Sequence, residues 1–158
     1  MQPEERDQLI AQYEDGYRAV ADALLKITPA ELDATPAPGK WSARQIVHHL
    51  ADSEMTAAVR FRLLVAEDKP AIKGYDQDGF AGRLHYDRPH EASLDLFRSA
   101  RAATAELMGC LTEADWLREG THSEMGRYGL DTWLRLYATH AHRHADQIRV
   151  ARKAVVRK

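Results

Sequence analysis

Eight histidines stand in this chain of 158 residues, and the spacing of three of them suits metal binding. His140 and His144 are four residues apart, a spacing that on a helix stacks two imidazole rings on one face, where both can bind the same ion. In the tandem His48-His49, a helical wheel places His49 about 90° and His48 about 170° from the centre of the apolar face. We therefore expect His49 to reach toward a partner helix, His48 to lie on the opposite side, and His142 to face solvent.

Three neutral imidazoles from two helices would leave a divalent cation with an open coordination position. Catalytic zinc sites have this arrangement, whereas closed structural sites take four protein ligands. An open position implies that water or a substrate binds there. The pattern alone leaves a second interpretation open, in which the histidines only pack or cap at the edges of their helices.

Apolar residues at three- and four-residue steps predict the elements that would position these side chains. Long amphipathic helices are expected over residues 3–27, 43–66, 90–110 and 130–152. Ser42 and Gln45 form a capping-box pattern at the start of the second helix, and similar patterns after Thr28 and Thr112 predict short helical turns.

The connections between these helices differ in length and composition. Residues 71–90, rich in glycine, aspartate and aromatic residues, are expected to form a long functional loop, and residues 118–129 an irregular crossing. The sequence therefore predicts one all-α domain over residues 1–158, a four-helix bundle with long connecting loops.

Composition excludes several classes of protein. Lysine and arginine number 22 against 24 acidic residues, a net charge of −2, which argues against general binding to nucleic acids or anionic membranes. No apolar run approaches the ~20 residues that span a bilayer, and no secretion signal opens the chain, so we expect a cytoplasmic protein. The single cysteine, Cys110, excludes an intrachain disulfide and a cysteine-rich zinc module.

Two segments carry a family resemblance. Residues 39–54 (GKWSARQIVHHLADSE) and 136–144 (LYATHAHRH), with the trailing Gln147, resemble the DinB-like metalloenzyme superfamily, and most of all its YfiT branch. Residues 70–76 and 86–89 are similar to that branch too, so the likeness extends over nearly the whole chain.

The resemblance implies a four-helix bundle that binds a divalent metal ion, nickel or zinc, through one histidine of the second helix and the H-x-x-x-H pair of the last. Matched by position, these are His49, His140 and His144, the same three that the helical wheels select. His48 would then be a spectator near the site or a surface residue.

The resemblance also implies activities. Members include thiol S-transferases that use low-molecular-weight thiols such as bacillithiol, a mycothiol-dependent isomerase, and proteins described as metal-dependent hydrolases. A divalent metal lowers the pKa of a bound thiol or water, so no protein nucleophile is needed. We predict a homodimeric thiol S-transferase acting on small electrophiles; the alternatives are a hydrolase that uses metal-activated water and a non-catalytic metal-binding stress-response bundle.

Two polar residues are spaced to support the ligands. Metal-bound imidazoles usually donate their second N–H to an acceptor, and Asp52 follows His49 by three residues, as Gln147 follows His144. Each could instead be an ordinary solvated helix residue.

Three further residues are candidates for substrate or cofactor binding. Arg60 and Arg143 could attract an anionic thiol toward the metal. Tyr75, in the predicted loop, could donate a proton or contact the substrate, or could simply pack the loop on the bundle.

Overall fold

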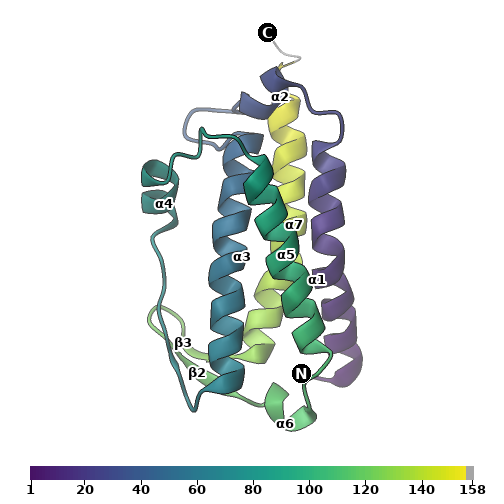
Figure 1. Ribbon diagram of the computed structural model, residues 1–158, viewed down its shortest axis with the longest axis vertical. Coiled ribbons are helices and arrows are strands. Elements are labelled where there is room, and N and C mark those ends of the chain that lie inside the picture. The colour runs from purple at the N-terminus through teal and green to yellow at the C-terminus, as the bar shows by residue number, and fades with distance from the viewer. Residues whose placement is uncertain (156–158) are drawn as a thin grey trace.

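Caps and breakers in the sequence set the limits of four long helices (Figure 1). The computed structural model describes residues 1–155. The long helices are α1 (Pro3–Leu24), α3 (Ala43–Ala66), α5 (Glu91–Met108) and α7 (Leu130–Arg152). α3 begins at the predicted capping box, in which the side chains of Ser42 and Gln45 each accept a hydrogen bond from the other residue's backbone N–H. α3 and α7 have the predicted bounds, whereas α1 ends earlier than expected.

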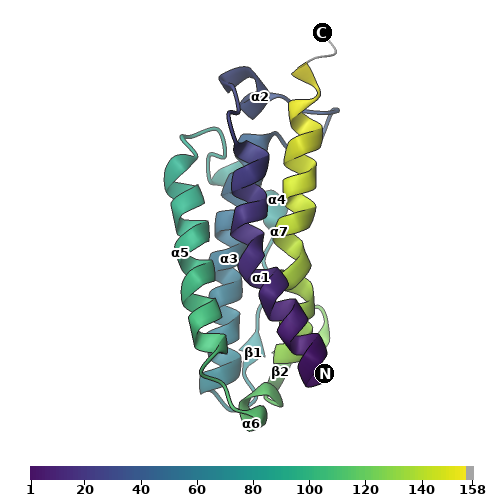
Figure 2. The ribbon, with the colours of Figure 1, turned by 90° about the vertical axis from the view of Figure 1, so that its right-hand side faces the viewer.

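The long helices do not alternate in direction along the chain. Figures 1 and 2 show that α1 and α7 run one way and α3 and α5 the other. α1 packs along α7, and α3 along α5, so each pair is parallel. Because α3 and α5 are parallel, the chain between them must return along the length of the bundle, and residues 67–90 do so beside α3. None of the helices in the described residues is both long and apolar enough to cross a membrane.

The return segment is more regular than the sequence predicted. Where a loop was expected over residues 71–90, the structure has the short strand β1 (Ala71–Ile72) and the helix α4 (Gln77–Arg83). α4 begins where the Asp76 side chain accepts a hydrogen bond from the backbone N–H of Gly79, at 2.9 Å. No residue of α4 is buried, so the helix has no apolar stripe for a periodicity search to find.

A small sheet replaces the irregular crossing that was expected over residues 118–129. β2 (Glu119–His122) pairs with β3 (Gly126–Gly129) as an antiparallel hairpin and with β1 as a parallel neighbour. Gly120 makes the β1 contact possible, because a Cβ atom there would lie 2.3 Å from the Pro70 carbonyl oxygen. The predicted short turns are α2 (Pro29–Asp33) and α6 (Glu113–Trp116), both with capping boxes.

A buried ion pair joins all four long helices at mid-height. Arg101 of α5 lies 2.5 Å from a carboxylate oxygen of Glu54 of α3 and donates to the backbone carbonyls of Tyr13 of α1 and Tyr137 of α7, at 2.6 and 2.9 Å. The Tyr13 hydroxyl bonds the other carboxylate oxygen. Gly16 leaves room for the guanidinium, since a Cβ atom at that position would lie 2.7 Å from it.

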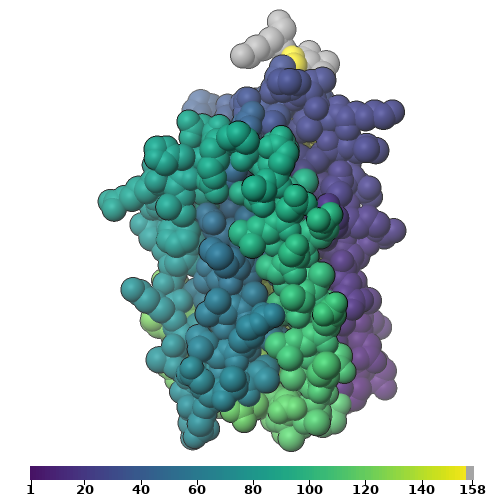
Figure 3. All heavy atoms as spheres, viewed as in Figure 1, coloured from purple at the N-terminus to yellow at the C-terminus, as the bar shows by residue number. Residues whose placement is uncertain are grey.

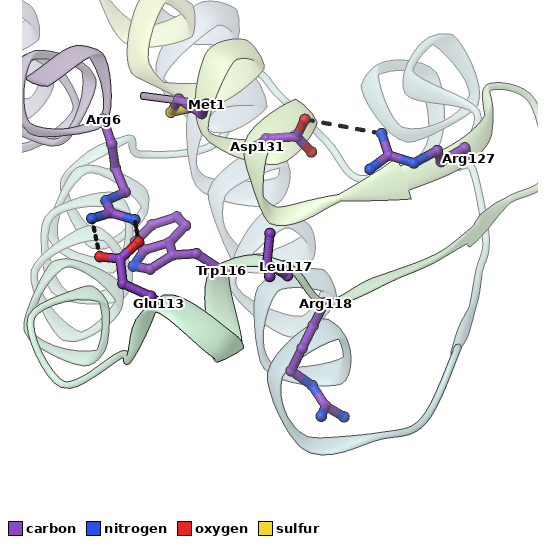
Figure 4. Close-up of a pocket in the computed structure, with 8 residues that line it drawn as sticks. All are labelled: Met1, Arg6, Glu113, Trp116, Leu117, Arg118, Arg127 and Asp131. Carbon is purple, nitrogen blue, oxygen red and sulfur yellow. Dashed lines mark hydrogen bonds and ion pairs between the residues drawn. The ribbon is translucent and has the colours of Figure 1, made fainter. Parts of the chain in front are cut away.

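At the end of the bundle where the chain begins, a hollow of about 120 Å³ lies between α1, α6 and the hairpin (Figure 4). Its charged side chains are already paired: Arg6 with Glu113, at 2.5 Å, and Arg127 with Asp131, at 4.0 Å. Arg118 donates to two backbone carbonyls at the C-terminal end of α3, which caps that helix. We interpret this region as a structural cap of the bundle.

Candidate metal site

Three histidines from two helices meet where α3 faces α7. His49 lies on α3, and His140 and His144 lie one turn apart on α7. Each offers a ring nitrogen, and these three atoms all lie within 4.8 Å of one another. The ring centroid of His49 is 5.4 Å from that of His140 and 4.7 Å from that of His144. The structure therefore brings together the three histidines that the sequence selected.

Burial keeps these rings neutral. Loss of hydration, together with the neighbouring His144, lowers the pKa of His49 to about 3. Burial together with the two neighbouring imidazoles lowers the pKa of His140 to about 2. Burial likewise lowers the pKa of His144 to about 4, against a hydrogen bond to Gln147 that raises it. Near neutral pH all three histidines are in the uncharged form that binds metals.

Hydrogen bonds fix how the rings on α7 are turned. Oε1 of Gln147 lies 2.9 Å from Nδ1 of His144, so this nitrogen carries the proton and donates it, and Nε2 keeps its lone pair. Nε2 of His140 lies 3.2 Å from Nε2 of His144. The contact predicted for Gln147 is therefore present, and it is the kind of contact that orients a metal-binding imidazole.

The donor set fits a divalent metal ion. The Nε2 atoms of His140 and His144 lie 3.2 Å apart, and Nδ1 of His49 is buried with no hydrogen-bond partner among the described residues. Buried polar atoms are rarely left unpaired unless a ligand, ion or water completes them. Imidazole nitrogen suits zinc, copper, iron and nickel, so the residues present could hold either predicted metal.

The cluster opens onto a cleft of about 800 Å³, a size common for small-molecule sites. Its walls come from the segment before α3, from α4 and from the last turns of α7 (Figure 1). The Trp41 ring lies against His49, with ring centroids 4.7 Å apart. The described residues that line it include no serine, threonine, cysteine or tyrosine; they are Pro36, Ala37, Gly39, Lys40, Trp41, Ile46, His49, Gln77, Asp78, His140, His144, Asp146, Gln147 and Val150. The described lining therefore offers no hydroxyl or thiol nucleophile.

Comparisons with known proteins agree with this geometry. A family model described as the DinB superfamily matches residues 12–148. The chain belongs to the DinB superfamily. YfiT from Bacillus subtilis, described as "a probable metal-dependent hydrolase with an unusual four-helix bundle topology", aligns with a TM-score of 0.89 and 29% identity over 97% of this chain and 89% of that one. The predicted bundle and the likeness to the YfiT branch are confirmed.

Two further relatives have names that describe them, with a similar qualification, as metal-dependent hydrolases. One, from Oceanobacillus iheyensis, is 32% identical over 88% of this chain and 81% of its own length. The other, from Bacillus mycoides, is 32% identical over 90% of this chain and 82% of its own length. These matches span most of both chains.

The prediction that Asp52 accepts a hydrogen bond from the His49 ring is wrong. A carboxylate oxygen of Asp52 instead accepts a hydrogen bond from the Tyr86 hydroxyl, at 2.7 Å, while Nδ1 of His49 has no partner in the described residues. The carboxylate faces the return segment rather than α7. Residues three apart on a helix share a face only roughly, so the Asp52 side chain could point toward α7 or toward the return segment. The return segment supplies its partner.

The other two histidines examined by helical wheel are less exposed than expected. His48 points away from the metal cluster, as predicted, but it is fully buried and not at the surface. Its Nδ1 lies 2.8 Å from Oγ of Ser93 on α5, and its Nε2 lies 3.1 Å from the Arg88 carbonyl oxygen. Figure 3 shows the return segment and α5 on either side of α3. His142, expected in solvent, is half-buried and bonds the Gln12 carbonyl, at 3.0 Å.

The three residues proposed for substrate or cofactor binding lie outside the cleft lining. Arg143 is exposed and donates to Oγ1 of Thr139, at 3.1 Å. Tyr75 is half-buried and packs between Phe80 and the guanidinium of Arg60, at 4.8 and 5.8 Å. Arg60 is buried. Their roles toward a substrate remain predictions.

Sequence reasoning missed three polar residues that line the cleft, Lys40, Gln77 and Asp78. Lys40 follows a run of prolines and glycine, and the two others lie on α4, which the sequence did not reveal as a helix. Their placement depends on the path of the return segment, for which the sequence carries no local signal.

Proposed function

We propose that this protein is a metal-dependent enzyme that activates a small thiol for transfer onto a small electrophile. The observation that carries the proposal is the meeting of three neutral imidazoles at a cleft whose described lining has no hydroxyl or thiol nucleophile. His49, His140 and His144 would hold the ion, nickel or zinc. Such an ion supplies Lewis acidity that lowers the pKa of a coordinated thiol or water.

The surroundings of the cluster favour a thiol over water. A coordinating thiol loses its proton outright, whereas attack by water commonly relies on a positioned base as well. Asp52, the carboxylate nearest His49 along α3, is bonded to Tyr86, and Asp146 at the rim is bonded to Arg149, at 2.7 Å, so a base for water would have to be Asp78 of α4. Hydrolysis is the second candidate, supported by the names of the relatives, and it would use the same three ligands.

The chain's own residues would position the reactants. Gln147 holds the His144 ring through Nδ1, and Trp41 packs on His49, so both limit how the ligand rings can turn. The cleft volume leaves room for an electrophile beside a small thiol.

The first measurement is the metal content per chain, by elemental analysis of untagged protein purified without a nickel column. We expect close to one ion per chain in the wild type and a large loss in His144→Ala. His142→Ala is the matched control on the same helix, because that ring bonds a backbone carbonyl of α1 instead of facing the cluster. No metal in the wild type, even after reconstitution with zinc or nickel, would defeat the proposal.

The second measurement separates the two reactions. Metal-loaded protein is assayed for conjugation of several thiols to chlorobimane and, in parallel, for cleavage of simple esters. Thiol conjugation that disappears in His144→Ala supports the transferase. Ester cleavage without conjugation of any thiol would establish the hydrolase in its place.

A further inference from the structure

One wall of the cleft is only loosely attached to the bundle. α4 contributes Gln77 and Asp78 to the cleft lining, yet no residue of α4 is buried. Figure 1 shows α4 at the edge of the molecule, beside α3. Among the described residues, the hydrogen bonds of residues 76–85, the α4 arm, are all made within residues 76–88. The α4 arm therefore forms part of the cleft without a hydrogen bond to any long helix in the part of the chain that is described.

The chain on either side of the α4 arm is, by contrast, held to α3. Before the arm, the Lys73 carbonyl accepts a hydrogen bond from the buried guanidinium of Arg60, at 2.7 Å. After the arm, the Tyr86 hydroxyl donates to the buried carboxylate of Asp52, also at 2.7 Å. Both flanks of the α4 arm are thus anchored, whereas little holds the arm itself in its present position.

A strained residue lies at the end of the α4 arm. His85 has a φ of 52°, in the left-handed region that residues other than glycine seldom adopt. It stands between Leu84, the C-cap of α4, and the anchored Tyr86. Hinges of closing segments are a few residues at the ends of elements, which absorb a large change in φ and ψ. A rotation at His85 would move α4 and leave Tyr86 in place.

We propose that the α4 arm is a lid, hinged at His85, that closes over the metal site and contacts the substrate through Gln77 and Asp78. The inference rests on the proposed function for the place where the substrate binds. The cleft of about 800 Å³ is much larger than a small thiol, so a substrate bound in the present structure would share it with water. Closure would expel this water, which would otherwise compete with the thiol for the electrophile.

The rival interpretation is that α4 is a fixed wall. Backbone hydrogen exchange, followed by NMR, distinguishes the two without any turnover. Zinc-loaded protein is measured alone and with each of two zinc-binding probes, N-acetylcysteine and benzohydroxamate. We expect the amides of residues 80–84 to exchange at least about tenfold more slowly with a probe present, because the closed lid opens less often, and to be unaffected by the probes in metal-free protein. Exchange in residues 80–84 that neither probe slows overturns the lid.

The two probes also separate this inference from the proposed function. Slower exchange in α4 with benzohydroxamate but not with N-acetylcysteine keeps the lid and counts against thiol transfer. Thiol conjugation by a protein in which neither probe slows exchange keeps the proposed function and overturns the lid.

Substitutions test the contacts of the lid. The double variant Gln77→Ala, Asp78→Ala should lose most of the slowing by the probes while it keeps the wild-type zinc content. Arg83→Ala, exposed on the same helix and outside the cleft lining, should keep both. Slowing that is as strong in the double variant as in Arg83→Ala overturns the assigned contacts.

Two substitutions of one residue test the hinge. His85→Val should abolish the slowing at unchanged zinc content, because a β-branched residue does not readily adopt the left-handed region and the α4 arm is displaced. His85→Asn should keep the slowing, because asparagine tolerates that region. Equal slowing in the two variants overturns His85 as the hinge.

Discussion

Two polar regions lie buried in this bundle, and they differ in how completely their atoms are paired. Around Arg101, each side-chain nitrogen of the guanidinium meets an oxygen, from Glu54 or from a backbone carbonyl of α1 or α7. In the histidine cluster, Nδ1 of His49 and Nδ1 of His140 have no partner within the described residues. The closed network needs nothing further, whereas the open one has buried nitrogens without partners.

The difference separates positioning from chemistry. Arg101 touches all four long helices, so it fixes where α3 stands relative to α7, and with them the distance between His49 and His140. It has no access to the cleft. The histidines are suited to chemistry because the protein keeps all three rings uncharged and adds no fourth protein ligand. A buried polar group is therefore informative about function only after its partners have been accounted for.

The largest expected effect is on stability, from breaking the closed network. Arg101→Met removes the guanidinium and leaves the Glu54 carboxylate buried alone, which should lower the free energy of unfolding by about 3–5 kcal/mol. Urea denaturation followed by circular dichroism measures it. Arg98→Met, on the same helix but in an exposed ion pair with Asp95, should change it by less than about 1 kcal/mol. Equal losses in the two variants would show that Arg101 is not the node that joins the helices.

The sequence predicted the long helices because their signals are local. The capping box at Ser42 and the apolar stripes placed α3 and α7 at their observed bounds, and the capping box at Thr28 marked the start of α2. α4 and the strands were missed because they lack such signals. α4 buries no residue, and β1 pairs with β2 only because Gly120 lets the chain approach Pro70 from far away in sequence.

The same limit applies to the site. A helical wheel gives the angle of each side chain, which was enough to choose His49 over His48 and to pair His140 with His144. It does not show which other segment of the chain packs against that side of the helix. His48 and Asp52 were misjudged because the return segment, invisible to helix periodicity, supplies their partners at Arg88 and Tyr86.

The next largest effect is the stabilisation that zinc gives to the histidine cluster. Zinc should stabilise the wild type by about 2.7 kcal/mol when free zinc exceeds its Kd a hundredfold, because the ion binds only the folded cluster. His49→Ala should lose most of this increment, and a chelator should remove it from the wild type. Thermal unfolding with and without zinc measures the change. His85→Ala, an exposed histidine of the return segment, should respond to zinc as the wild type does; zinc stabilisation that survives in His49→Ala would place the ion elsewhere.

A smaller effect tests the single hydrogen bond that orients the cluster. Gln147→Met removes the acceptor at Nδ1 of His144 and should weaken zinc binding by roughly 10- to 100-fold. Gln147→Glu keeps an acceptor at the same place and should restore most of the affinity. Competition with a chromophoric chelator measures both constants. If methionine and glutamate give the same constant, the His144 ring is held by packing against His49 and His140 instead.

The smallest effect distinguishes the two directions in which Asp52 could act. Since the carboxylate bonds Tyr86, Asp52→Asn should leave zinc affinity unchanged and lower the free energy of unfolding by about 1 kcal/mol. Tyr86→Phe should cost a similar amount, and the double variant less than the sum, because both changes remove one shared bond. Additive losses, or zinc binding weakened in Asp52→Asn alone, would show that Asp52 acts on His49. The histidine cluster would then have one more hydrogen-bond partner than the structure shows.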